Sequence, residues 1–247
     1  MILESSLIYI NLSYEGKLMK NLRKQIAILA ISFVSFVGVQ SVSAIEGVSV
    51  GVALNTSAFM GSGKETMTGS GASTTQSDVT EEDGAFKDDV ASAFLEYALN
   101  DVVSFGIEMF AEDVTTPENL NVQQSGSGEN GSGLDNRVKA SFKDHTTFYA
   151  NVNMPFGTYL KLGYITVDVA TEESLGTGSK YNDVDTTGYT VGLGYQYKAD
   201  NGVFARIEAS VAEYDDVNAV STVDSSKKVE VTEMYGAVAS FKIGKSF

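Results

Sequence analysis

Residues 187–198 read TGYTVGLGYQYK. Its apolar side chains recur at every second position, and glycine or small polar residues occupy most of the positions between them. Successive side chains of a strand point in opposite directions, so a period of two separates the two sets onto opposite faces. The apolar row consists of Tyr189, Val191, Leu193, Tyr195 and Tyr197. The stretch therefore predicts a β-strand with one apolar and one polar face.

Seven further segments show the same alternation. The predicted strands cover residues 47–60, 88–99, 102–113, 138–154, 158–170, 187–198, 203–215 and 231–247. Three connections are tight turns, and the other four are long and polar: residues 61–87, 114–137, 171–186 and 216–230. Strands of about ten residues, even in number and joined alternately by short turns and long loops, are typical of a transmembrane β-barrel. We therefore predict an all-β fold, an eight-stranded antiparallel up-and-down transmembrane β-barrel with its long loops outside the cell.

The N-terminal region predicts export. Residues 19–44 read MKNLRKQIAILAISFVSFVGVQSVSA, in which a basic start precedes an apolar stretch and then small residues. This is the layout of a helical secretory signal peptide, with cleavage expected after Ala44. The apolar stretch is shorter than the ~20 residues of a membrane-spanning helix, although a permanent N-terminal anchor is the alternative. We expect residues 1–18 to be an upstream extension before the true start at Met19, and residues 45–247 to form the barrel domain.

Composition and charge exclude several classes of function. The chain of 247 residues carries 17 Lys and Arg against 32 Asp and Glu, a net charge of −15. An acidic protein is a poor partner for nucleic acid, whose phosphates require a basic surface. Cysteine is absent, which excludes disulfide scaffolds and thiolate sites. The single histidine, His145, has no nucleophile motif beside it, so we predict no enzyme, no metal and no cofactor, with a lipid-acting barrel enzyme as the minor alternative.

Charges of both signs lie on the row opposite the lipid face. An eight-stranded barrel is only wide enough for side chains to fill its interior, so these charges are expected to pair across the lumen. Arg206, Glu208, Glu96 and Glu108 are the candidates for such a group. Two interpretations remain open: a polar plug that blocks or gates a narrow water path, or charges that merely keep the lumen polar and rigid. The predicted lumen cluster is Glu96, Glu108, Glu112, Lys143, Lys161, Arg206, Glu208 and Lys242.

Aromatic residues fall near both ends of the predicted strands. Two aromatic girdles with an apolar band of roughly 25 Å between them are expected of a membrane barrel. A soluble sandwich or a soluble barrel would alternate in the same way, but its apolar face would point inward. The aromatic residues on the lipid-facing rows are Tyr97, Phe105, Tyr195, Tyr197 and Phe247 near the turns, and Phe142, Tyr164, Tyr189 and Tyr235 near the long loops.

The region 45–247 resembles the small eight-stranded outer-membrane barrels of the OmpA/OmpX-like, opacity-type family. Its last residue, Phe247, shares a row with Phe241 and Ile243, which is similar to the C-terminal signal that the barrel-assembly machinery reads. Lys245 departs from that pattern, because the family usually has an aromatic or apolar residue there.

The resemblance implies a location in the outer membrane of a Gram-negative-type bacterium, with outer-membrane lipids and the barrel-assembly machinery as partners. It also implies a non-enzymatic role in envelope integrity and in surface interaction through four mobile extracellular loops, with a ligand that the sequence does not identify. A small low-conductance porin for ions or very small solutes is the alternative. The acidic loops lack a calcium-binding pattern, so they predict a solvated anionic surface.

Overall fold

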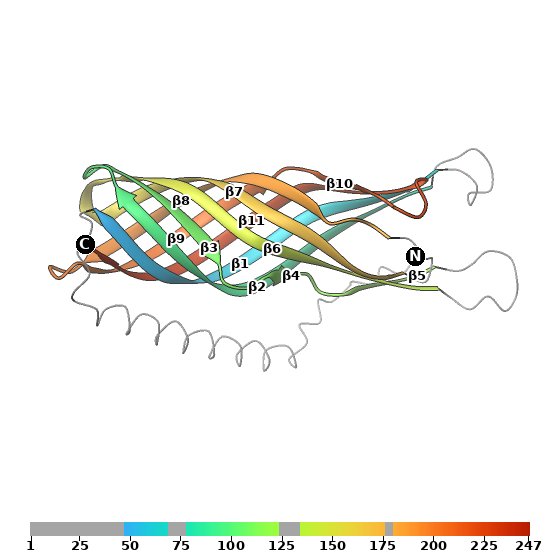
Figure 1. Cartoon of the computed structure of the whole chain (residues 1–247), viewed down its shortest axis with the longest axis horizontal. Coiled ribbons are helices and arrows are strands. Elements are labelled where there is room, and N and C mark those ends of the chain that lie inside the picture. Colours follow the sequence, from blue (N-terminus) through green and yellow to red (C-terminus); the bar gives the residue numbers. More distant parts are fainter. Residues whose placement is uncertain (1–46, 69–77, 124–133, 176–179) are drawn as a thin grey trace, which may run out of the picture. The chain divides into compact units, whose positions relative to one another are not determined.

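The computed structural model describes residues 47–68, 78–123, 134–175 and 180–247 (Figure 1). The predicted signal peptide and upstream extension lie outside these described residues. No helix in the described part of the chain is long and apolar enough to cross a membrane.

Eight long antiparallel strands form the wall of a barrel in the described ranges. Each pairs with its neighbour, and pairing of the first with the last closes the ring. They are β1 (Val48–Met67), β2 (Asp78–Ala98), β3 (Val103–Phe110), β6 (Leu134–Asn153), β7 (Thr158–Leu175), β8 (Val184–Lys198), β9 (Val203–Tyr214) and β11 (Lys227–Ser246). The predicted fold class and all eight predicted strands are confirmed.

The stagger of the ring is ten residues. The paired residues can be followed from strand to strand once around the barrel. The row that starts at Lys87 on β2 returns to β2 at Tyr97, ten residues farther along the strand. A staggered ring requires tilted strands, at about 40° to the barrel axis. The oblique course of the strands is visible in Figure 1.

The two faces of the wall differ as a membrane requires. Large apolar side chains such as Leu193 and Ile207 point outward and are 58% and 60% exposed. The inward rows carry small, polar and charged residues, many of them buried. The closed ring leaves no sheet edge unpaired along the apolar band, and hydrocarbon tolerates only such a closed sheet. The alternative of a soluble barrel with an inward apolar face is therefore wrong.

Much of the chain that the sequence predicts as long loops is strand. β1 and β2 continue past the apolar band as far as Met67 and Asp78, and β6 and β7 continue in the same way (Figure 1). Three short strands add to these extensions: β4 (Val114–Thr115) and β5 (Asn119–Gln123) pair with β6, and β10 (Val217–Val220) pairs with β11. Alternation of apolar and polar residues does not detect such strands, because water reaches both of their faces.

A bulge in β6 reverses which residues face inward. The register between β6 and β7 shifts between Lys143 and Thr146, and Asp144 has a φ of 51°. The extra residue exchanges the two faces beyond this point. Phe142 consequently lies inside the barrel, stacked with Phe59 and Phe86, and the prediction that it faces lipid is wrong.

Candidate functional site in the barrel lumen

Glycines make room for large side chains in the lumen. A Cβ atom on Gly194 would collide with the ring of Tyr159, and one on Gly106 would collide with the ring of Tyr149. Each tyrosine therefore lies flat over the backbone of the neighbouring strand and turns its hydroxyl toward the barrel interior. These two hydroxyls reach the charged groups described next.

Arg206 on β9 and Glu96 on β2 form a bidentate ion pair inside the barrel. Arg206 Nη1 donates to Glu96 Oε2 at 2.8 Å, and Nη2 donates to Oε1 at 2.9 Å. Two parallel charge-assisted hydrogen bonds fix both side chains in one geometry. The remaining capacity of the carboxylate is filled by donors from Ser104, Tyr149 and Asn151, and Arg206 Nε donates to Gln196.

Two lysines and two glutamates form a second cluster, which we call the charge quartet: Glu108, Lys161, Glu208 and Lys242. Lys161 Nζ lies 2.9 Å from Glu108 and 3.1 Å from Glu208, and Lys242 Nζ lies 2.7 Å and 3.1 Å from the same two carboxylates. Tyr159 donates to Glu208 at 2.8 Å. The quartet and the Arg206–Glu96 pair together hold three positive and three negative groups, so the buried charge is compensated.

A hydrogen-bonded chain leads from the charge quartet toward the extracellular side. Ser92 donates to Glu108, Asn55 donates to Ser92, and Ser240 donates to Asn55, at 2.7, 3.0 and 2.6 Å. These short polar side chains link β1, β2 and β11 across the inner face.

An aromatic layer lies farther along the same inner rows. Phe59 and Phe86 stack with their ring centroids 5.2 Å apart, and Phe142 stacks on Phe86 at 6.2 Å. His145 stacks on Phe110 at 4.1 Å, and its Nε2 lies 3.1 Å from the hydroxyl of Tyr214. The lumen is therefore filled by two different layers, one charged and one aromatic. Sequence reasoning missed the aromatic layer because Phe86 lies in a predicted loop and Phe142 lies beyond the bulge.

The structure brings six of the eight predicted lumen charges together and places two elsewhere. Glu112 follows the end of β3 at Phe110 and is exposed, so it is not one of the buried charges. Lys143 lies opposite the exposed Asp168, on the outer face, because the bulge reverses the row before it reaches this position. The C-terminal row is on the outer face, where Phe241 is exposed and Ile243 is half-buried.

The chemistry available in the lumen is that of ion pairs and hydrogen bonds. His145 Nδ1 is buried without a hydrogen-bond partner, and no serine oxygen is hydrogen-bonded to the ring in the described part of the chain. Among the described residues, no group of three or more acidic or histidine side chains is arranged to hold a metal ion.

A closed antiparallel ring with an apolar outer face and compensated charges inside is the arrangement of an outer-membrane β-barrel. The chain is therefore a membrane-spanning eight-stranded β-barrel, the fold that its resemblance to the small outer-membrane barrels predicts.

No protein-family model matches the chain, and no curated protein matches it. Several solved outer-membrane proteins are similar to it. OprG from Pseudomonas aeruginosa is 12% identical, with a TM-score of 0.47 over 83% of this chain and 98% of that chain. The outer membrane protease OmpT from Escherichia coli is 10% identical, with a TM-score of 0.46 over 84% of this chain and 99% of that chain. Neisserial surface protein A is 11% identical, with a TM-score of 0.36 over 82% and 98%. The classification of this chain rests on its own ring closure and its two faces.

Proposed function

We propose that the protein is a closed, non-enzymatic anchor that supports the envelope and presents extended strands for interaction outside the cell. The observation that carries this proposal is the compensated lumen, in which six charged side chains from β2, β3, β7, β9 and β11 bind one another. Such a network links strands that are not neighbours in the ring. It favours a rigid barrel over the alternative, a porin for ions or very small solutes.

The extended part of β2 is the surface that we assign to interaction. The ladder between β2 and β3 ends where Ser92 pairs with Phe110, and beyond it Ala91 O accepts a hydrogen bond from Ala111 N. From there to Val79, β2 pairs with β1 alone among the described strands. Every second residue on this edge turns its N–H and C=O groups away from β1, which is a template for adding a strand.

The side chains of this edge indicate the kind of partner. Residues 79–85 are exposed, and they include Glu81 and Asp83. Because like charges repel and opposite charges attract across a strand pair, the edge favours an extended segment that carries Lys or Arg. We therefore propose an extended basic polypeptide segment as the extracellular ligand.

The experiment uses the full barrel in lipid nanodiscs and a synthetic peptide of alternating Lys and Val. We expect binding that weakens with salt. Ala85→Pro removes an N–H from the free edge and should reduce binding, while the matched control Ala85→Val keeps the N–H and should bind like the wild type. Equal binding by the proline variant, or by a peptide with methylated backbone nitrogens, contradicts strand addition.

A further inference from the structure

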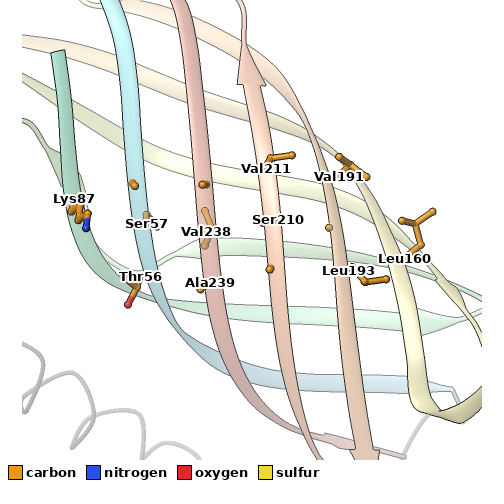
Figure 2. Close-up of a pocket in the computed structure, with 14 residues that line it drawn as sticks. Thr56, Ser57, Lys87, Leu160, Val191, Leu193, Ser210, Val211, Val238 and Ala239 are labelled. Carbon is orange, nitrogen blue, oxygen red and sulfur yellow. The ribbon is translucent and has the colours of Figure 1, made fainter. Parts of the chain in front are cut away.

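A groove crosses the outward, lipid-facing side of the barrel wall. It has a volume of about 610 Å³ and extends from Lys87 on β2, across β1, β11, β9 and β8, to Leu160 on β7 (Figure 2). Its side chains are mostly apolar. Every exposed part of the apolar band lies against lipid, so the groove must be filled by lipid or by another apolar group.

The register explains why the wall is hollowed here. Two adjacent rows of small side chains follow the pairing from strand to strand: Ala58 pairs with Ala237 on one row, and Thr56, Ala239 and Ala209 follow one another on the next. These residues give the groove its floor on β1, β11 and β9. Because the strands are tilted, the rows run obliquely across the membrane.

Bulky side chains border the two small rows. On the extracellular side Met60 pairs with Tyr235, and on the periplasmic side Leu54 pairs with Phe241, which pairs with Ile207. Met60, Tyr235, Phe241 and Ile207 are all large and at least 44% exposed. The strip of small residues is therefore a depression between two walls, and across β1, β11 and β9 it covers two strand spacings, or roughly 10 Å.

Lys87 lies at the extracellular end of this depression. It pairs in register with Ala58, its side chain is exposed, and it forms no ion pair with the residues that the structure describes. The next outward-facing residue along β2 is Asp89, which lies two residues closer to the periplasm and is half-buried. An unpaired ammonium group where the apolar band ends is complementary to a phosphate at the membrane surface.

We propose that this groove binds one acyl chain of a phosphorylated outer-leaflet glycolipid, with a phosphate of its headgroup paired to Lys87. The long extensions of β1 and β2 place the Lys87 end on the extracellular side, where the outer leaflet of this membrane presents lipid A phosphates. The small residues of the floor and the bulky residues of the walls leave room for one acyl chain. In a membrane all apolar surfaces are equally shielded from water, so close packing is what favours binding at one of them.

The test is native mass spectrometry of the refolded barrel released from detergent with added lipid A or dephosphorylated lipid A. The wild type should retain one lipid A molecule and little dephosphorylated lipid A. Lys87→Gln should lower lipid A retention about fivefold, the worth of one lysine near a charged membrane surface. Ala237→Phe should lower it about tenfold, because the ring occupies the space of the chain.

Matched variants make the result decisive. Lys198→Gln removes a lysine at the opposite end of the barrel, and Ala93→Phe adds a ring to the lipid face outside the groove; both should retain lipid A. Ala209→Leu fills the groove from another strand if Ala237→Phe does not fold, and gel migration of unboiled samples reports folding. Unchanged retention in the folded groove variants overturns the site, and equal retention of dephosphorylated lipid A by the wild type overturns the phosphate contact.

Discussion

Arg206 and Glu96 meet across the lumen from β9 and β2, two strands that are separated in the ring by β11 and β1. Their two parallel hydrogen bonds hold opposite sides of the barrel together in a buried place. The neighbouring charge quartet does the same for β3, β7, β9 and β11. The interior of this barrel is consequently a structural element that holds the wall together.

Glu96→Ala should destabilise the barrel strongly. The substitution leaves the guanidinium of Arg206 buried without its partner, and breaking a buried pair in this way costs about 3–5 kcal/mol. The double variant Glu96→Leu with Arg206→Met should recover most of that loss, because it removes both charges. Urea unfolding in lipid vesicles measures both effects. An Ala variant with the unfolding midpoint of the wild type would contradict a stabilising role for the pair.

Gly194→Ala should also destabilise the barrel. The added Cβ collides with the ring of Tyr159, whose hydroxyl donates to Glu208, so the ring and its hydrogen bond must both move. Overpacking of this kind costs about 1–3 kcal/mol. Gly84→Ala is the control, since a Cβ there meets no atom within 4 Å. Equal unfolding free energies for the two variants would show that Tyr159 does not need the space.

The sequence predicts the wall of this barrel better than its interior. Residues 187–198 alternate because lipid and lumen impose opposite requirements on each strand. The pairing of Arg206 with Glu96 depends on the stagger of ten residues, which the turns and bulges set jointly and no single strand reveals. Simple alternation along β6 predicts the wrong faces for Lys143 and Phe142, because the bulge at Asp144 exchanges the inward and outward rows beyond it.

His145 should be a packing residue, with no role in hydrolysis. His145→Ala removes a ring stacked on Phe110 and should cost roughly 2–4 kcal/mol. His145→Phe keeps the stacking and should cost less than half as much. Neither the wild type nor either variant should release fatty acid from phospholipid vesicles. Hydrolysis by the wild type that disappears in both variants would instead make the protein an enzyme.

The turn at Asp224 should loosen in acid. The backbone N–H and the hydroxyl of Ser226 both donate to Asp224, at 3.1 and 2.6 Å, and these bonds hold the pKa of that carboxyl below its usual value. Because the pKa of Asp224 is lower in the folded protein than in the unfolded chain, the ionised carboxylate stabilises the turn at a pH above the pKa of the unfolded chain. This stabilisation is lost as the pH falls through the pKa of the folded protein. The protection factor of the Ser226 amide, which compares its exchange rate with that of an unstructured peptide at the same pH, should therefore fall at low pH. Asp224→Asn should exchange without that dependence; an unchanged pH profile in the variant would exclude this carboxylate as the cause.

Ion conductance across planar bilayers shows whether the lumen is closed. The wild-type barrel should show no sustained channel, because the charge quartet and the aromatic layer both fill its interior. A barrel that combines Glu108→Ala with Phe86→Ala and Phe142→Ala, and that still folds, should conduct. Steady conductance by the wild type, unaffected by these substitutions, would contradict the closed anchor and establish a small porin in its place.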